Sequence, residues 1–317
     1  MSKPQILDGK QIAKDIYKEI AEKVEKLIDA GKRAPHLAVI FVGDDGASKT
    51  YVESIQKKSQ EVGITSSVYH YPSTITQEEL FESIDFLNQD PEVDGYIIQL
   101  PLPQHISTEE VAQRVDPEKD IDCFNPINMG NLVLGKNNFS PATPMACMEI
   151  LKRSKIDTIG KKAVVIGRSN IVGKPLALLL AQNKDDANAT VTLAHSKTQN
   201  LPEIAREADI LLVAMGKPEM IGKEYVKEGA VVIDVGIHRV KDETATKGYR
   251  ICGDVNYNEV APLTSAITPV PGGVGSVTMS CLLLNTLRAY KIFEDRSYPM
   301  AETGCDCISD PHCDCAH

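Results

Sequence analysis

The stretch that most constrains the fold is residues 162–180, KAVVIGRSNIVGKPLALLL, where an apolar run leads through a glycine-bearing loop into a helix-forming segment. Residues 163–166 have the length and composition of a buried strand. Gly167 permits a sharp turn after that strand, and Gly173 permits close approach of the backbone to a ligand or to a neighbouring element. Pro175 lacks an N–H group and suits the first turn of the helix that follows. The stretch predicts a strand–turn–helix unit within an α/β sheet.

The start of that helix would present backbone N–H groups that can bind a phosphate. The glycine spacing is not G-x-G-x-x-G, however, and strand–turn–helix units also serve packing alone. On this stretch by itself, ligand binding and plain packing both remain open interpretations.

The composition excludes several classes of protein. Of the 317 residues, 42% are hydrophobic and 25% are charged, which are ordinary globular values, and the length predicts two domains. No run approaches the ~18 apolar residues of a membrane-spanning helix. The N-terminal segment has neither a signal core nor the composition of a transit peptide, so we expect a cytoplasmic protein without a membrane role. A net charge of -10 argues against a nucleic-acid binder, so a local cluster of donors must meet any anionic ligand.

The first half of the chain alternates between helical and strand patterns. Apolar residues at intervals of four draw one stripe along a helix at residues 11–28. Such alternation predicts a mostly parallel sheet with helices on both faces. The expected elements after the first helix are strands at residues 37–42, 67–71 and 95–100 and helices at residues 48–62 and 76–87.

Two polar motifs follow the last strand of this series. Residues 100–103, Leu-Pro-Leu-Pro, cannot continue a ladder, so Gln99 is expected at the carboxyl end of a parallel strand, where α/β sheets bind ligands. Its amide can equally bind the next loop. In KDID, Asp120 and Asp122 alternate with an apolar residue and are expected to point the same way. Two such carboxylates can bind a ligand amine or cap loops, and the residues alone leave both uses open.

The second half of the chain continues the α/β pattern without repeating the sequence. Thr143 and Pro144 are expected as the N-cap and first residue of a helix, and we place the crossing between the domains there. Further strands are predicted at residues 163–166, 190–193, 210–213 and 231–235.

The loops at the carboxyl ends of these strands are expected to share one edge of the sheet. Arg168, Ser196 and Lys197 would bring cationic and hydroxyl donors to that edge, which suits a phosphate. His195 beside them can serve as a base, but packing and hydrogen bonding are the commoner use, and we assign it no catalytic role.

A dense glycine–proline segment, TPVPGGVG at residues 268–275, precedes a helical pattern at residues 276–288. Its prolines and glycines predict a stiff turn that leaves backbone N–H groups available at the helix start. Such density is seldom needed for packing alone, so we interpret the segment as one wall of a ligand-binding cleft.

The motifs YVES with its downstream VGI, DGYIIQLPLP, KDID, GRSNIVGKP and TPVPGGVG occur in this order. Together they resemble the methylene-tetrahydrofolate dehydrogenase / methenyl-tetrahydrofolate cyclohydrolase family over about residues 6–293. The resemblance implies two α/β domains with a cleft between them. Residues 1–141, completed by a returning helix at residues 276–293, would hold folate, and residues 142–275 would form a Rossmann-type NADP-binding domain.

The resemblance also implies the reaction. Methylenetetrahydrofolate would be oxidised to methenyltetrahydrofolate with NADP, and the family's second activity hydrolyses that product to formyltetrahydrofolate. Both steps belong to one-carbon metabolism, which feeds purine biosynthesis. Members form dimers through the cofactor domain, so we expect a homodimer.

Individual positions acquire roles through the same resemblance. Tyr51 would stack on the pterin, Gln99 would support the catalytic group, and Asp122 would bind the donor edge of the pterin. The remaining folate-binding positions are Leu100, Pro101, Pro271, Gly272, Gly273 and Val274. The cofactor-binding positions are Gly167, Arg168, Ser169, Ile171, Gly173, Pro175, His195, Ser196, Gly236 and Ile237. Arg168 and Ser196 match positions that bind the 2′-phosphate in members using NADP, so we expect NADP rather than NAD.

One position departs from the family in a way that bears on the chemistry. The family has Tyr-x-x-x-Lys, and its lysine acts on the folate nitrogen and the attacking water in the cyclohydrolase step, whereas this chain has Ile55. Isoleucine cannot give or take a proton. Lys57 lies on a different helix face and Lys58 a further turn from Tyr51, so neither is an evident replacement. We therefore expect a dehydrogenase with weak or absent cyclohydrolase activity, because hydride transfer needs mainly alignment of two bound molecules.

The last residues, 304–317, lie beyond the resemblance and are rich in cysteine and histidine. Cys305, Cys307, Cys313 and Cys315 with the two histidines can satisfy a tetrahedral zinc ion, but C-x-C pairs lack the usual spacing, and a flexible tail without metal is the alternative. The other cysteines stand singly and are expected to be free thiols. Two rival functions stay open: a non-catalytic relative that binds folate or nucleotide, and a metal-binding interaction protein acting through the tail.

Overall fold

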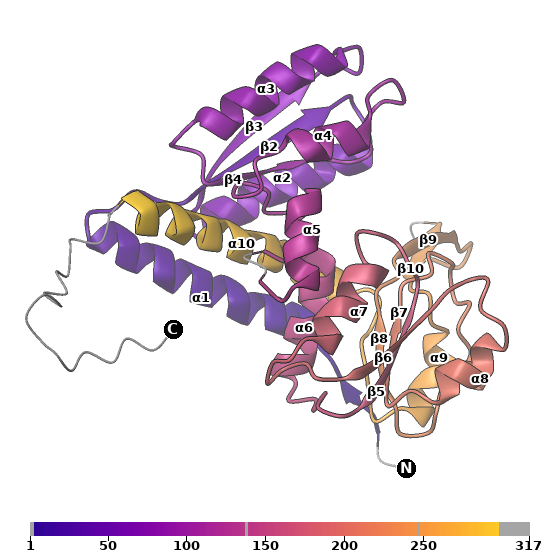
Figure 1. The fold of residues 1–317 in the computed structure, drawn as a ribbon. Coiled ribbons are helices and arrows are strands. Elements are labelled where there is room, and N and C mark those ends of the chain that lie inside the picture. The colour runs from indigo at the N-terminus through magenta and orange to yellow at the C-terminus, as the bar shows by residue number, and fades with distance from the viewer. Residues whose placement is uncertain (1–2, 137–138, 246–247, 298–317) are drawn as a thin grey trace, which may run out of the picture.

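The computed structural model describes residues 3–136, 139–245 and 248–297. Two α/β lobes lie on either side of two long helices, α1 (Gly9–Asp29) and α10 (Val274–Ser297) (Figure 1). The predicted two-domain α/β architecture with parallel sheets is confirmed. The cysteines of the C-terminal segment, which the sequence suggested as metal ligands, lie outside the described residues.

The first lobe is a three-stranded parallel sheet with helices on both faces. Its elements are β2 (His36–Val42), α2 (Gly46–Glu61), β3 (Thr65–Tyr71), α3 (Gln77–Gln89), β4 (Gly95–Ile98) and α4 (Thr108–Arg114). The strand order is β3-β2-β4, and the strands are parallel, as the alternating pattern predicted. Successive residues of β2 enter different apolar cores, so that Val39 packs with α1 and α2, and Ile40 packs with α3 and α4.

The second lobe contains a six-stranded parallel sheet in the order β1-β11-β8-β7-β5-β6. Its strands are β1 (Gln5–Ile6), β5 (Lys162–Ile166), β6 (Thr190–Ala194), β7 (Ile210–Val213), β8 (Val231–Asp234) and β11 (Ala266–Ile267). Its helices and 3-10 turns are α7 (Gly173–Ala181), α8 (Leu201–Arg206), η1 (Lys223–Tyr225), α9 (Tyr257–Val260) and η2 (Ala261–Leu263). The four strands expected here are all present.

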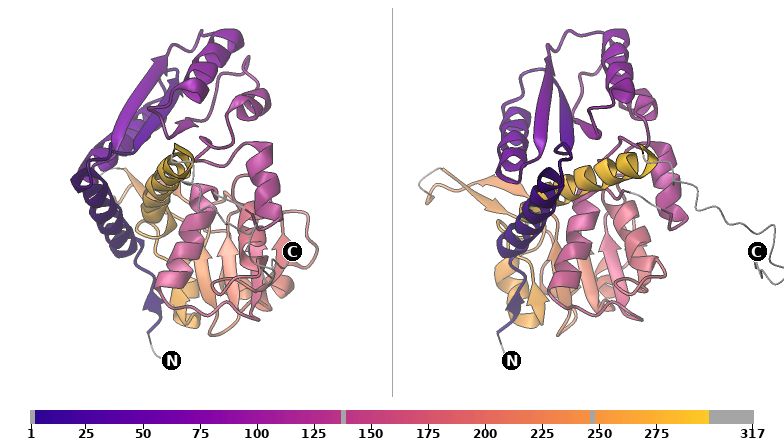
Figure 2. Two further views of the ribbon diagram at one scale, coloured as in Figure 1. Left: turned by 60° about the vertical axis from the view of Figure 1, so that its left-hand side comes forward. Right: turned by 90° about the vertical axis from the view of Figure 1, so that its left-hand side faces the viewer.

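A shared core joins the two lobes. β1 lies at one end of the second sheet, and α1 leaves from it toward the first lobe, so the N-terminal residues belong structurally to both. α10 lies beside α1 and returns the chain to the first lobe (Figure 2). One continuous apolar cluster contains Val39 of β2, Ile16 of α1, Leu283 of α10 and Val165 of β5. The lobes are therefore packed against a common helical layer.

Four local features differ from the sequence expectations. The helix α6 (Ala142–Arg153) begins two residues earlier than expected, with Pro141 at the N-cap, so Thr143 does not cap it. Pro144 is still tolerated because the first-turn residues of a helix need no N–H partner. β4 ends at Ile98, two residues before the expected end of that strand. The sequence patterns did not predict the short helix α5 (Pro126–Val133) or the hairpin of β9 (His238–Lys241) and β10 (Tyr249–Cys252). Such short elements carry little periodicity.

Cysteine chemistry and membrane insertion can be addressed for the described part of the chain. The four cysteines there are free and buried, as predicted for scattered single thiols: Cys123, Cys147, Cys252 and Cys281. None of the helices in the described ranges has the length and apolarity that crossing a membrane requires.

Candidate functional site

One group of predicted residues gathers where α1, α2 and the segment after β4 meet. Tyr51 on α2 is half-buried, and it lies within electrostatic reach of Tyr17 of α1 and of Asp122. Burial raises the pKa of the Tyr51 phenol, and the charge of Asp122 raises it further. Burial also raises the pKa of Tyr17 to about 12. The structure thus brings Tyr51 and Asp122 to one place.

Asp120 and Asp122 divide between them the two uses that the sequence left open. Asp120 is buried and accepts hydrogen bonds from the backbone N–H groups of Phe124 (3.0 Å) and Asn125 (2.8 Å) and from Nδ2 of Asn128 (2.8 Å), so it holds the loop. Asp122 is half-buried, and no hydrogen bond to its carboxylate is observed among the described residues. Burial, and then the negative charge of Asp120, raise the pKa of Asp122 to about 7. Asp122 is therefore the carboxylate that is available to a ligand.

Gln99 makes its observed hydrogen bonds locally. Its backbone N–H donates to the carbonyl of Ile40 (2.8 Å), and its side-chain Nε2 donates to the carbonyl of Leu100 (2.7 Å). This is the local bonding that the sequence left open as an alternative to ligand contact. Leu100 also lines a recess together with Asp122, whereas Pro101 is exposed.

The glycine-rich segment before α10 packs against the start of α1. A Cβ atom on Gly9 would clash with the carbonyl oxygen of Gly273, so the two backbones are in direct contact. Gly272 has a φ of +108°, which side-chain-bearing residues rarely adopt. Pro271 is exposed, and Val274 is buried at the start of α10. The glycines are therefore required in part by packing, a cause that the sequence interpretation did not include.

In the turn between β5 and α7, backbone segments pack directly against one another. A Cβ on Gly173 would clash with the carbonyl oxygen of Gly167, and one on Gly167 would clash with that of Ala214 beyond β7. The hydroxyl of Ser169 accepts from the N–H groups of Val172 (3.1 Å) and Gly173 (3.4 Å). The first N–H groups of α7 are thus already bonded, contrary to the expectation that they would face a phosphate.

The backbone N–H groups that remain available in the described part of this turn lie before the start of α7. Within the described ranges, the N–H groups of Ser169, Asn170 and Ile171 have no protein acceptor. Ser169 and Ile171 are exposed, and Pro175 is buried in the first turn of α7. The loop itself, rather than the helix start, offers its backbone to an anion.

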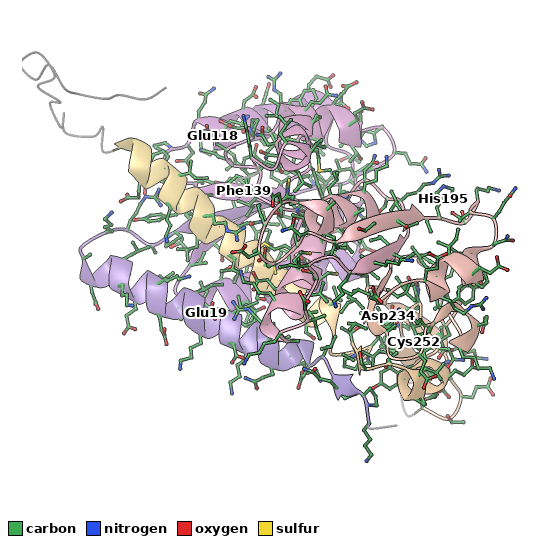
Figure 3. The ribbon with its side chains drawn as sticks, turned by 60° about the horizontal axis from the view of Figure 1, so that its bottom comes forward. Glu19, Glu118, Phe139, His195, Asp234 and Cys252 are labelled. Carbon is green, nitrogen blue, oxygen red and sulfur yellow. The ribbon has the colours of Figure 1, made fainter. Side chains whose placement is uncertain are left out.

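Strand pairing brings two of the predicted polar loops together at one edge. Ile166 of β5 pairs with Ala194 of β6, so Arg168 and His195 follow neighbouring strand ends. Arg168 and Ser196 are exposed, and the Arg168 guanidinium meets no acceptor among the described residues. His195 is half-buried, and its Nδ1 accepts from the N–H of Lys197 (3.2 Å). Its observed role is local hydrogen bonding, and Figure 3 shows it far from Asp234.

Two buried carboxylates at the same edge were missed at the sequence level. Asp234 ends β8 and accepts from the N–H of Gly236 (3.0 Å), while Asp254 accepts from the N–H groups of the loop after β7. Ile237 next to Gly236 is 65% exposed, so this loop presents an apolar side chain at the edge. A polar residue that closes an apolar strand, as Asp234 does, was the available signal for the pair.

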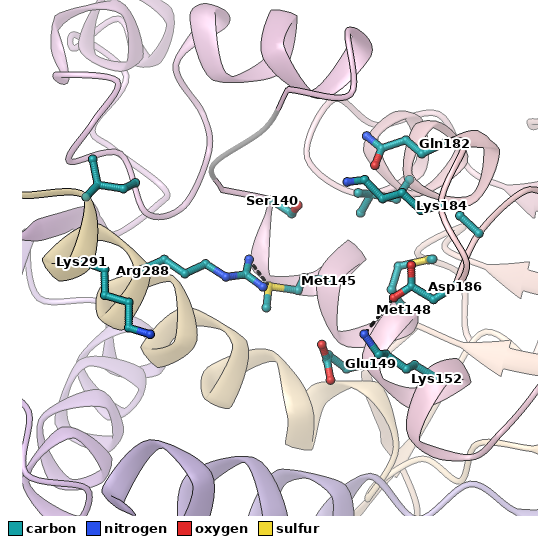
Figure 4. Close-up of a pocket in the computed structure, with 13 residues that line it drawn as sticks. Ser140, Met145, Met148, Glu149, Lys152, Gln182, Lys184, Asp186, Arg288 and Lys291 are labelled. Carbon is teal, nitrogen blue, oxygen red and sulfur yellow. Dashed lines mark hydrogen bonds and ion pairs between the residues drawn. The ribbon is translucent and has the colours of Figure 1, made fainter. Parts of the chain in front are cut away.

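A pocket beside α10 contains none of the predicted site residues. It has a volume of about 450 Å³ and lies among α6, the end of α7 and the second half of α10 (Figure 4). Its lining includes Lys152 paired with Asp186 at 3.0 Å, and Arg288 near the sulfur of Met145. No cluster of three or more potential metal ligands occurs in residues 3–136, 139–245 and 248–297.

This fold defines a two-lobed α/β protein whose second lobe is of the Rossmann type. The catalytic-domain model of the tetrahydrofolate dehydrogenase/cyclohydrolase family matches residues 7–122, and the NAD(P)-binding-domain model of the same family matches residues 141–294. The chain belongs to the tetrahydrofolate dehydrogenase/cyclohydrolase family.

Individual relatives agree with the family models over nearly the whole chain. The bifunctional protein FolD of Cytophaga hutchinsonii is 49% identical over 285 residues, which are 90% of this chain and 98% of that protein. The structure of the bifunctional enzyme FolD from Campylobacter jejuni is 44% identical, with a TM-score of 0.85 and coverage of 92% and 99%. The structure of FolD from Trypanosoma brucei, complexed with NADP cofactor and inhibitor, is 38% identical, with a TM-score of 0.86 and coverage of 94% and 100%.

The position of Asp122 yields a prediction about its titration. Because burial and the charge of Asp120 disfavour the ionised form, the carboxyl should titrate near pH 7, protonated below that value and charged above it. Carbon-13 NMR of aspartate-labelled protein should therefore show a carboxyl inflection near pH 7 that disappears in Asp122→Asn. An inflection near the ordinary aspartate value of about 3.9 would contradict the burial of this group.

Proposed function

We propose that this protein oxidises methylenetetrahydrofolate to methenyltetrahydrofolate with NADP, and that its cyclohydrolase activity is weak or absent. The observation that carries the dehydrogenase proposal is the pairing of two matched lobes through one core. One lobe carries Tyr51 and Asp122 together, and the other carries a backbone loop with unused N–H groups beside Arg168. Each lobe falls within a domain model of the same enzyme family.

On the folate side, we propose that Tyr51 stacks on the pterin and that the Asp122 carboxylate accepts hydrogen bonds from its donor edge. A charged carboxylate accepts two such bonds, so folate should bind more tightly as the pH rises through about 7, where Asp122 ionises. We propose that Gln99, whose side-chain amide donates to the carbonyl of Leu100, supports the catalytic group. We propose that the walls of the folate pocket are formed by Leu100, Pro101 and residues 271–274. We also propose that the boundary between the two domains lies between residues 141 and 142.

On the cofactor side, the residues fit a phosphorylated dinucleotide. The loop after β5 has free backbone donors, and Arg168 adds a charged fork at its exposed side. NADP supplies the hydride acceptor when it is bound. Ser169, Ile171, Gly173 and Pro175 shape the turn. His195 and Ser196 follow the adjacent strand β6, whereas Gly236 and Ile237 follow β8, which β7 separates from β5 at the same edge.

The preference for NADP can be tested at Arg168. Replacing this arginine by alanine removes charge-assisted hydrogen bonds to the 2′-phosphate worth about 1.5–3 kcal/mol, so the Kd for NADP should rise roughly 10- to 100-fold while that for NAD stays unchanged. Calorimetry with both dinucleotides measures this. Arg168→Lys, which keeps the charge without the fork, should fall between wild type and alanine. Equal losses for NAD and NADP would contradict a role in recognising the 2′-phosphate.

The doubt about the second activity rests on Ile55. Its side chain is 0% exposed and packs in the core shared by α1, α2 and α10, one helical turn from Tyr51. The buried hydroxyl of Ser59, a further turn along, has no hydrogen-bond partner among the described residues. Position 55, one helical turn from Tyr51, therefore offers no group that can accept or donate a proton in hydrolysis.

A gain-of-function variant tests this proposal directly. Ile55→Lys places an amine one turn from Tyr51, with the Ser59 hydroxyl within its helix face as an acceptor. Conversion of methenyl- to formyltetrahydrofolate should rise by roughly 10²-fold, within the usual range for general acid–base groups, while NADP-dependent oxidation changes little. The two products are followed separately in one assay.

Ile55→Met is the matched control, because it has a comparably long side chain without an amine. It should leave hydrolysis as slow as in the wild type. Wild-type hydrolysis at a rate equal to that of Ile55→Lys would defeat the proposed loss of cyclohydrolase activity. If the wild type binds folate and NADP without producing NADPH, the rival interpretation of a non-catalytic relative would replace the dehydrogenase.

We further propose a homodimer that supplies one-carbon units, for example to purine biosynthesis, in the cytoplasm. The support for the assembly is β6, which ends the six-stranded sheet, carries no charged residue and leaves Leu193 38% exposed. Sedimentation equilibrium should give about twice 34.6 kDa, and Leu193→Lys should shift the mass toward one chain. Ile6→Lys, at a 47% exposed residue of β1 at the opposite end of the same sheet, should not. A wild-type mass of 34.6 kDa would contradict the dimer.

A further inference from the structure

Asp254 and Asp234 form a buried pair at the carboxyl edge of the second sheet, next to the loops that we assign to the cofactor. We propose that these two carboxylates are positioning residues that fix the loops after β7 and β8 relative to the turn after β5, and thereby set NADP affinity. This inference rests on the proposed cofactor site.

Asp254 gathers four donors from two loops. Its side chain is 0% exposed and accepts from the N–H groups of Met215 (2.6 Å), Gly216 (3.1 Å) and Lys217 (2.8 Å). Its Oδ1 also lies 2.7 Å from Nε2 of His238, at the start of the hairpin. A single carboxylate therefore ties the loop after β7 to the segment after β8.

Asp234 fixes Asp254 in turn. Its carboxylate accepts from the N–H groups of Gly236, Asp254 and Val255, each at 3.0 Å. Its own N–H donates to Oγ1 of Thr268 (2.8 Å), which ties the end of β8 to the glycine-rich segment before α10. Burial raises the pKa of Asp234 to about 6, and the nearby charge of Asp254 contributes to the shift.

The backbone approaches these carboxylates as closely as glycine allows. A Cβ on Gly253 would clash with Oδ2 of Asp234, and one on Gly236 would clash with the Asp254 carboxyl group. The loops are therefore packed on the two side chains with no space for adjustment, so a change in either carboxylate must move backbone.

The contacts continue from Asp254 to the turn after β5. The loop that Asp254 holds begins at Ala214, whose N–H donates to Ile166 (2.8 Å) and whose carbonyl oxygen abuts Gly167. Gly167 in turn abuts Gly173. Displacement of residues 215–217 would thus alter the surface against which the free N–H groups at residues 169–171 are placed.

A structural role alone does not account for this arrangement. Burying two like charges side by side costs desolvation and mutual repulsion, which offset the hydrogen bonds that the carboxylates accept. Both carboxylates lie at the ligand-binding edge of the sheet, where pinned loops preorganise a site. Their expected contribution is therefore to ligand affinity more than to folding.

Asp254→Asn tests the inference, because the amide cannot accept on both sides and at least one loop N–H loses its partner. Losing a buried acceptor costs about 1–3 kcal/mol, so the Kd for NADP should rise about tenfold or more. The KM for NADP should rise with it, while kcat at saturating NADP and the Kd for folate change less than about twofold.

Asp209→Asn is the matched control at the opposite end of the same sheet. Asp209 also accepts a backbone N–H, that of Lys162 (3.0 Å), and pairs with Lys227 (2.6 Å). This variant loses a backbone acceptor and an ion pair at a more exposed position away from the edge, so its NADP affinity should equal that of the wild type. Equal loss of NADP affinity in both variants would overturn the inference, because it would show a general destabilisation.

His238→Ala removes one of the four donors and keeps the inference testable if Asp254→Asn does not fold. It should raise the Kd for NADP more than the Kd for folate. Either variant binding NADP as tightly as the wild type, or losing both ligands equally, would refute the positioning role. Failure of the wild type to bind NADP would instead refute the proposed function, so the two failures are distinguishable.

Discussion

The two lobes are placed by one apolar core that runs between their sheets. Ile16 of α1 and Leu283 of α10 belong to the same buried cluster as Val39 of the first sheet and Val165 of the second. Because protein interiors are close-packed, neither sheet can shift far against this helical layer without opening voids. The distance between the residues that we assign to folate and those that we assign to the cofactor is thus set by core packing, and these side chains themselves need make few contacts.

Backbone N–H groups are central to the cofactor site that we propose in this acidic protein. In a chain with a net charge of -10, the turn after β5 exposes its N–H groups together with the guanidinium of Arg168. Backbone donors cannot be repositioned by rotamer changes, so contacts with the neighbouring structure must fix the loops that carry them. The carboxylates of Asp234 and Asp254 serve that purpose, since each accepts several N–H groups from neighbouring loops.

The sequence predicted the long, periodic elements and failed where the cause lies in tertiary contact. Helix α1 and the longer strands of both sheets followed from apolar spacing, and the expectation of two domains followed from the chain length. β1 has two residues and takes its place only by pairing with β11, so no local pattern could reveal it. Likewise, Asp120 and Asp122 are equivalent in sequence, and only the packing of Phe124 and Asn125 over Asp120 shows which carboxylate is already bonded.

The proposed separation of the two chemical steps rests on Ile55. A position that is 0% exposed would hold an amine largely in its neutral form, because burial disfavours the charged form, and a neutral amine can accept a proton. Isoleucine occupies that position with apolar contacts alone, which leaves α2 and therefore Tyr51 in place. Oxidation depends on the alignment that the shared core provides, whereas hydrolysis depends on the proton transfer that isoleucine cannot perform. Under the proposed function, the same packing therefore preserves oxidation while it withholds hydrolysis.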